Sequence, residues 1–184
     1  MKKRLVESLE MVLVSDPNIC IVADNMVAEW GGVTYPQLSV ILSHLKFLSS
    51  LHQNHHWITN GDPFYGDHLL FQRLYEGAIE DIDAIAEKSI GVGSTYNVDI
   101  NLTTQQMHKL IQGSGMSSTI PQKSDLARSS YLAEMNFLKV VSHLVDQMKE
   151  SNSLSRGVDN LIAGIEDKHE GFCYLLKQRI NSGK

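Results

Sequence analysis

Apolar residues recur every three or four positions along four long stretches of the chain, with polar residues between them. This spacing places the apolar side chains on one face of a helix, so each stretch predicts a long amphipathic α-helix. We expect these helices over residues 36–57, 62–90, 124–151 and 155–181. Prolines are few and strand-length alternation of Val, Ile and Thr with polar residues is missing from the sequence. The pattern therefore favours an all-α fold.

The links between these stretches predict how the helices are connected. A Gly-Asp-Pro break at 61–63 and a Ser-Asn-Ser turn at 151–153 are short, as between antiparallel neighbours. We expect Asp62 to cap the second helix, and Gly91 and Gly93 to end it. Residues 94–121 form a much longer link with one short helix at 103–112, capped by Thr103. A single long crossover of this kind is typical of ferritin-like four-helix bundles.

The N-terminal part has a weaker pattern. Residues 4–14 predict a short amphipathic helix, and residues 19–35 predict irregular chain with a turn of helix at 23–29 and a stop at Gly31-Gly32. The length of 184 residues is sufficient for one domain with a sizeable core. We therefore expect a single ferritin-like domain over 1–184, in which 1–33 is an N-terminal extension and 34–184 is the bundle.

The amino-acid composition and net charge argue against several classes of protein. Charged residues make up 20% of the chain and the net charge is −5, which does not favour a basic nucleic-acid binder. Lys2, Lys3 and Arg4 form a basic tip that we expect to be a solvated terminus. Cys20 and Cys173 are too few and too far apart for a disulfide framework. The apolar runs are too short for a signal peptide or a membrane span, so we expect a cytoplasmic protein that does not enter membranes.

Two histidines and two carboxylates have the composition of a metal site. His56 and His68 lie twelve positions apart across the Gly-Asp-Pro break, and Asp83 and Glu87 lie on one face of the second helix. On one continuous helix, His68 and Asp83 are about 22 Å apart, so one chain cannot bring both to one ion. We therefore predict an intersubunit site. An antiparallel partner across a two-fold axis would supply the carboxylates, which gives two identical sites per dimer.

The other histidines are expected to have structural roles. His55 adjoins His56, but neighbouring helix positions point about 100° apart, so only one of them can face the site. The position of His56, facing His68 across the Gly-Asp-Pro break, favours His56; the resemblance to a known family signature, which contains a His-Trp pair and a second histidine twelve positions later, selects it. His44 and His52 are single histidines on a helix, which are more often structural than metal-binding.

Other carboxylates and a second histidine motif are not part of the predicted site. We expect Glu76, Glu80 and Asp81 to lie on a solvated face, which in a hollow shell is the cavity wall. Glu166 and His169 form a Glu-x-x-His, the repeated element of di-iron sites inside a single bundle. The other long helices carry no second copy, so we expect His169 to be packed or hydrogen-bonded.

The pattern His56-Trp57, Gly61, Phe64, His68 and Asp83-x-x-x-Glu87-Lys88 resembles the signature of the Dps family, the DNA-protecting mini-ferritins. The resemblance is strong over residues 54–93 and weaker in the last helix, around 167–169 and 174–176. It implies a dodecameric ferritin-like shell that binds Fe²⁺, oxidises it with hydrogen peroxide or dioxygen, and stores Fe³⁺ inside. By the same resemblance, Trp57 lies near the irons. One departure is Gln72, where the family usually has an acidic residue, and this weakens the second iron position.

The sequence therefore predicts a ferroxidase with His56, His68, Asp83 and Glu87 as catalytic metal ligands, and Gln72 as a weaker additional ligand. The alternative is a DNA-coating, nucleoid-type protein with a vestigial metal site. A third reading, a shell that binds zinc or manganese, stays open because histidine and carboxylate ligands do not choose decisively among these metals.

Overall fold

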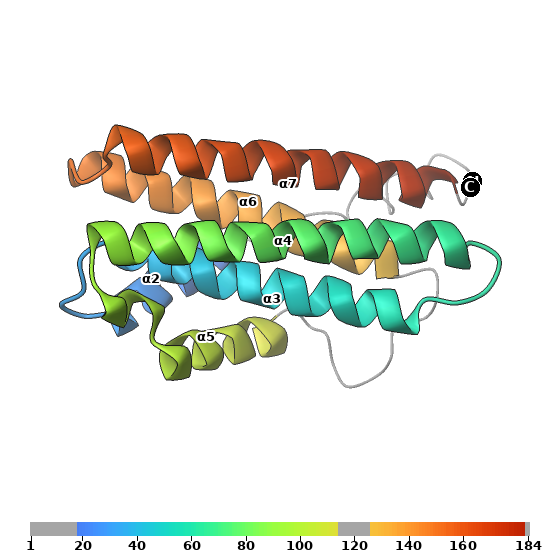
Figure 1. The fold of residues 1–184 in the computed structure, drawn as a ribbon, viewed down its shortest axis with the longest axis horizontal. Helices are drawn as coiled ribbons and strands as arrows, with labels where there is room; N and C mark the ends of the chain where they lie inside the picture. The colour runs from blue at the N-terminus through green and yellow to red at the C-terminus, as the bar shows by residue number, and fades with distance from the viewer. Residues whose placement is uncertain (1–17, 114–125, 183–184) are drawn as a thin grey trace.

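Four long helices form the bundle in the computed structural model, which describes residues 18–113 and 126–182 (Figure 1). Every regular element in these two ranges is a helix. The long helices are α3 (Pro36–Ile58), α4 (Phe64–Val92), α6 (Leu126–Glu150) and α7 (Arg156–Ser182). The shorter elements are α2 (Ile19–Glu29), the 3₁₀ helix η1 (Thr95–Val98) and α5 (Ile100–Gly113).

The connections between the helices confirm the predicted topology. α3 and α4 lie side by side and run in opposite directions, as do α6 and α7 (Figure 1). The α6–α7 turn is tight, with Asn152 in the left-handed conformation at φ 52°. Between α4 and α6 the chain makes one long crossover, which carries η1 and α5. The all-α four-helix bundle with an extra helix in its crossover was therefore predicted correctly.

Several helix boundaries were predicted wrongly. α4 begins at Phe64 after Pro63 and has no side-chain cap, so Asp62 does not cap it. α5 begins at Ile100, where the Asp99 carboxylate accepts a hydrogen bond from the Leu102 N–H (2.8 Å), and Thr103 lies inside the helix. Gly91 also lies inside α4, whereas Gly93 does follow its last residue. These ends are set by nearby backbone hydrogen bonds, which side-chain type alone does not specify.

The helix α2 extends from Ile19, whereas only a turn of helix around 23–29 was expected. Its side chains Ala23 and Met26 and the following Trp30 are fully buried against the bundle. Because its first four residues are Ile-Cys-Ile-Val, the sequence there shows no helical alternation, and packing against α3 and α6 compensates. The expected helix at 4–14 and the basic tip at 2–4 lie outside the described residues.

Gln106 of α5 fixes the crossover helix against α2 and α3. Its buried side-chain oxygen accepts hydrogen bonds from the Trp30 indole N–H (3.1 Å) and the Ser43 hydroxyl (3.0 Å). Its amide nitrogen donates to the Met26 carbonyl (2.9 Å) and to the Glu29 carboxylate (3.1 Å). Both polar ends of a buried amide are thereby satisfied, so the crossover is held in one position.

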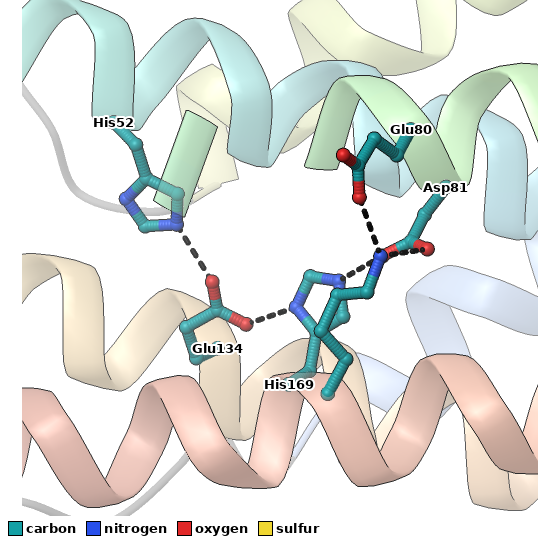
Figure 2. Close-up of polar contacts among 6 residues, drawn as sticks. His52, Glu80, Asp81, Glu134 and His169 are labelled. Carbon is teal, nitrogen blue, oxygen red and sulfur yellow. Dashed lines mark hydrogen bonds and ion pairs between the residues drawn. The ribbon is translucent and has the colours of Figure 1, made fainter. Parts of the chain in front are cut away.

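A buried ionic network connects the four long helices (Figure 2). Glu134 of α6 lies between two imidazoles, with His52 Nε2 of α3 at 2.7 Å and His169 Nδ1 of α7 at 2.5 Å. His169 Nε2 is 3.3 Å from Asp81 of α4, and that carboxylate accepts from Lys168 Nζ (2.8 Å). The side chains of His52, Glu134 and His169 are fully buried. The network therefore contains at least one side chain from each long helix of the bundle.

Glu134 and His169 stabilise each other in their charged forms. Burial alone would lower the pKa of His169, but the charge of Glu134 and the hydrogen bonds that the imidazole donates to Asp81 and Glu134 outweigh it and raise that pKa to about 9. Burial would raise the pKa of Glu134, but the charge and hydrogen bonds of His169 and His52 lower it to about 2. Asp81, expected on a solvated face, is buried within this network, and that expectation was wrong.

We predict that the free energy of unfolding falls as the pH rises from about 6.5 to about 9. The folded-state pKa of His169 lies above its ordinary value of 6.5, so its stabilisation is complete below 6.5 and is lost as the pH passes 9. Glu134 and Asp81 face this imidazole directly, and His52 lies on the other side of Glu134. The measurement is chemical denaturation across this range at fixed protein concentration, for the wild type and His169→Gln.

His169→Gln should flatten the slope, and the wild-type decline should be on the order of a few kcal/mol. The matched control is His143→Gln, because the His143 ring is 32% exposed and faces Asp24 at the surface. An equal slope in the wild type and His169→Gln would contradict the assignment.

Candidate metal centre

The α3–α4 turn brings His56 and His68 into direct contact. α3 ends at Ile58, and the chain reverses through Gly61, whose φ of 84° is in the left-handed region that glycine adopts without strain. His56 lies near the end of α3 and His68 near the start of α4, so the reversal places them side by side. Their rings are stacked, with centroids 3.7 Å apart and planes 23° apart. This contact was predicted from the spacing across the Gly-Asp-Pro break.

Reciprocal hydrogen bonds fix both imidazoles. Nδ1 of His56 donates to the backbone carbonyl of His68 (2.9 Å), and Nδ1 of His68 donates to the backbone carbonyl of His56 (3.1 Å). A carbonyl oxygen can only accept, so both Nδ1 atoms carry the proton. In the neutral rings, each Nε2 therefore has the lone pair that binds a metal ion.

Aromatic rings enclose the histidine pair on both sides. Phe64 stacks on His68, with centroids 5.0 Å apart and planes 29° apart. Tyr75 contacts His56 edge-on, with centroids 5.3 Å apart and planes 73° apart. The four rings form a row from Phe64 through the two imidazoles to Tyr75, which restricts their rotation. Sequence reasoning missed Tyr75, although its position seven residues after His68 places it two helical turns further along α4.

His55 points away from this pair, as predicted. Its ring is buried in the bundle, with Nδ1 2.8 Å from the Ser130 hydroxyl and the ring edge-on to Phe71. Burial, together with the charge of His52, lowers the pKa of His55 to about 3. His44 is also buried, and burial lowers its pKa to about 4. Both therefore stay neutral inside the bundle, and His169 is hydrogen-bonded within the ionic network as expected.

Asp83 and Glu87 are exposed and lie far along α4 from His68. The helix is continuous from Phe64 to Val92, so the fifteen positions between His68 and Asp83 span about 22 Å. Within the described ranges, no group of three or more His, Cys, Asp or Glu side chains is placed to hold a metal ion. The chain thus brings the two histidines together but leaves the two carboxylates apart from them.

An exposed stripe of α4 contains these carboxylates. Positions 69, 72, 76, 79, 83, 87 and 90 recur every three or four residues and therefore share one face of the helix. Leu69, Ile79 and Ile90 on this stripe are 46%, 48% and 42% exposed. At the nearby turn, Trp57 is 66% and Tyr65 is 73% exposed. Large apolar side chains gathered along one exposed face are typical of protein interfaces.

Gln72 lies on the same stripe, one turn after His68. Its side-chain amide nitrogen donates to the Glu76 carboxylate (2.8 Å), so Glu76 fixes the orientation of the amide. The amide oxygen remains as the possible metal donor. A neutral oxygen does not offset the charge of a second cation as a carboxylate would.

An ion pair anchors the first turn of α4 to the last turn of α7. The guanidinium of Arg179 binds the Asp67 carboxylate through both Nε and Nη2, the latter at 3.0 Å. The hydrogen bonding of the guanidinium to the Asp67 carboxylate, which accepts, is the main cause that raises the pKa of Arg179. Because Asp67 is buried and directly precedes His68, this bidentate contact also fixes the start of the histidine-bearing turn. The two residues are 112 positions apart, and no local sequence pattern indicates their contact.

None of the described helices is both long enough and apolar enough to cross a membrane.

Comparisons with known proteins show similarity at the level of structure. No family model matches the sequence, and no curated protein matches it. Dps from Thermosynechococcus elongatus is 14% identical, with a TM-score of 0.65 over 88% of this chain and 94% of that one. Dps from Microbacterium arborescens in the high iron form is 14% identical, with a TM-score of 0.65 over 91% and 98%. DpsC from Streptomyces coelicolor is 15% identical, with a TM-score of 0.66 over 91% and 88%.

Because these identities are low, the comparisons show that the fold is shared and do not assign roles to individual residues. The agreement covers most of each chain. The chain has the ferritin-like fold of the Dps proteins.

Proposed function

We propose that this protein is an iron-oxidising and iron-storing shell that removes Fe²⁺ and hydrogen peroxide at a site shared between two subunits. The observation that supports it best is the His56–His68 pair. Two imidazoles are held in contact, each with Nδ1 fixed as a donor and Nε2 left as a ligand. A carbonyl bond to the second nitrogen of a histidine is the usual support of metal-binding histidines.

A second copy of the chain would complete the site. If α4 of two subunits pack antiparallel across a two-fold axis near positions 76–77, His68 of each is level with positions 83–87 of the other. The exposed apolar residues Leu69, Ile79 and Ile90 favour this packing, because they share the stripe with Asp83 and Glu87. Two carboxylates within an apolar interface need a positive partner when they are buried, and an Fe²⁺ ion supplies it.

The proposed ligand set suits Fe²⁺ as a substrate. Neutral nitrogens of His56 and His68 would come from one subunit, and charged oxygens of Asp83 and Glu87 from the other. Such a mixed set with open positions lets the bound ion react with an oxidant. The oxidant is hydrogen peroxide or, less readily, dioxygen. Fe³⁺ would then be deposited inside a shell, for which we propose twelve subunits.

The similarity to solved structures supports iron as the ion. The structure from Microbacterium arborescens is described as the high iron form of that protein, and it shares the fold over 91% of this chain. Zinc or manganese would fit the same ligands, so the test below includes them as competitors.

We predict that His56→Ala and Asp83→Ala each reduce the initial rate of Fe²⁺ oxidation by about tenfold or more, because each removes a direct ligand. The rate is followed by the absorbance of the ferric product after Fe²⁺ and hydrogen peroxide are added to purified protein. His108→Ala is the matched control, since His108 is exposed on α5 and belongs to no predicted site.

Rates in the two site variants equal to that of the control would overturn the proposal. Binding of zinc or manganese by the wild type, together with no ferric product after Fe²⁺ is added, would assign the site to those metals instead.

We predict that Gln72→Asp raises the number of Fe²⁺ ions bound per site. The substitution supplies a carboxylate one turn after His68, where the chain now has a neutral amide held by Glu76. Anaerobic titration with Fe²⁺ by calorimetry measures this number, with Gln72→Ala as the control. An unchanged number in Gln72→Asp would show that the amide is not what limits the second position.

A further inference from the structure

We propose that Tyr75 supplies the second electron when hydrogen peroxide is reduced at the His56–His68 site. This inference rests on the proposed ferroxidase function and names a residue that the predicted ligand set does not include. Tyr75 would act as an electron donor next to a ligand of the iron.

The position of Tyr75 supports this role. Its ring and the His56 imidazole are in a T-shaped contact, with centroids 5.3 Å apart and planes 73° apart. Electrons pass readily between rings in van der Waals contact. Tyr75 is half-buried, whereas Tyr65, Tyr96 and Tyr174 are 73%, 55% and 62% exposed. A partly buried phenol adjacent to the site can be oxidised there with limited access of solvent reductants.

Because Gln72 weakens the second iron position, peroxide reduction needs an electron donor other than a second Fe²⁺ ion. Reduction of one peroxide molecule to water takes two electrons, and each Fe²⁺ ion gives only one. With a neutral amide at position 72, held by Glu76, the second iron position is weak, so one Fe²⁺ ion reacts at a time. A second reductant must then lie within contact distance of the site, or the peroxide is reduced by one electron only.

The proposed step balances in atoms and charge. One Fe²⁺, one tyrosine, one hydrogen peroxide and one proton give Fe³⁺, a tyrosyl radical and two water molecules. The O–O bond breaks; the iron and the phenol each lose one electron, and the phenol also releases its proton. A later Fe²⁺ ion and a proton return the radical to tyrosine. Without the phenol, one Fe²⁺ and one peroxide give Fe³⁺, hydroxide and a hydroxyl radical.

Trp57 is the competing donor in the chain. It directly follows His56, but its side chain is 66% exposed in the single subunit. We favour Tyr75 because its ring contacts the His56 imidazole directly.

The test is freeze-quenched electron paramagnetic resonance of the full-length protein, loaded with one Fe²⁺ per site and mixed with hydrogen peroxide. The wild type should give a tyrosyl radical signal, which Tyr75→Phe should abolish because phenylalanine retains the ring but lacks the phenol. Tyr174→Phe, in an exposed tyrosine of α7, should leave the signal intact. In Tyr75→Phe, spin trapping should detect hydroxyl radical that the wild type does not release.

Gln72→Asp provides a second, independent readout. If the added carboxylate lets two Fe²⁺ ions react together, Gln72→Asp loaded with two Fe²⁺ per site should give no tyrosyl signal although Tyr75 is unchanged. A radical signal that persists in Tyr75→Phe, or that is lost only in Trp57→Phe, would overturn the inference. Rapid Fe²⁺ oxidation in the wild type with no tyrosyl signal would refute the role of Tyr75 alone. Absence of Fe²⁺ oxidation in the wild type would instead refute the proposed function.

Discussion

The unbroken helix α4 is the constraint on which the candidate metal centre depends. It carries His68 in its second turn and Asp83 and Glu87 in its last turns, and it contains no kink that could bring them together. A straight helix of this length separates them by about 22 Å or more. The histidine pair and the carboxylate pair therefore lie near opposite ends of α4, and each pair is one half-site of the predicted metal centre. Because the two half-sites are this far apart, the four predicted ligands can meet at one ion only if two copies of α4 pack against each other.

The rest of the bundle makes the histidine half-site rigid. Asp67 and Arg179 fasten the first turn of α4 to the end of α7, and each imidazole of the pair donates to the backbone of the other helix. The ionic network around Glu134 links all four helices in the interior. Removing one partner of a buried charged pair commonly costs about 3–5 kcal/mol, so the relative positions of the helices are well defined. Two ligands held in this way lose little entropy when an ion binds.

Much of this arrangement could be predicted from the sequence because it is encoded locally. The apolar spacing predicted the four long helices, and the Gly-Asp-Pro break predicted the contact between His56 and His68. Adjacent positions on a helix diverge, so only one of His55 and His56 could face the site, and the twelve-residue spacing to His68 with the adjacent Trp57 selected His56. The carboxylates Asp83 and Glu87 were placed on one exposed face by the same periodicity.

The features that were missed depend on contacts between distant segments. Asp81 resembles any acidic residue on a polar helix face, and only Lys168 and His169 of α7 explain its burial. Glu134 has no local signal, because its partners lie on α3 and α7. Arg179 pairs with a residue 112 positions earlier. In each case the charge is stabilised by tertiary packing, which helical periodicity does not encode.

The most direct test of the shared site is a complementation experiment with two inactive variants. One chain carries His56→Ala and His68→Ala, the other Asp83→Ala and Glu87→Ala, and the two are co-expressed in equal amounts with different tags and purified over both tags as mixed shells. If each site takes its histidines from one subunit and its carboxylates from the other, one of the two sites in each mixed dimer is intact. With random pairing about half of the dimers in a shell are mixed, so about a quarter of the wild-type rate of Fe²⁺ oxidation per subunit should return. Mixed shells as inactive as either parent would contradict the account.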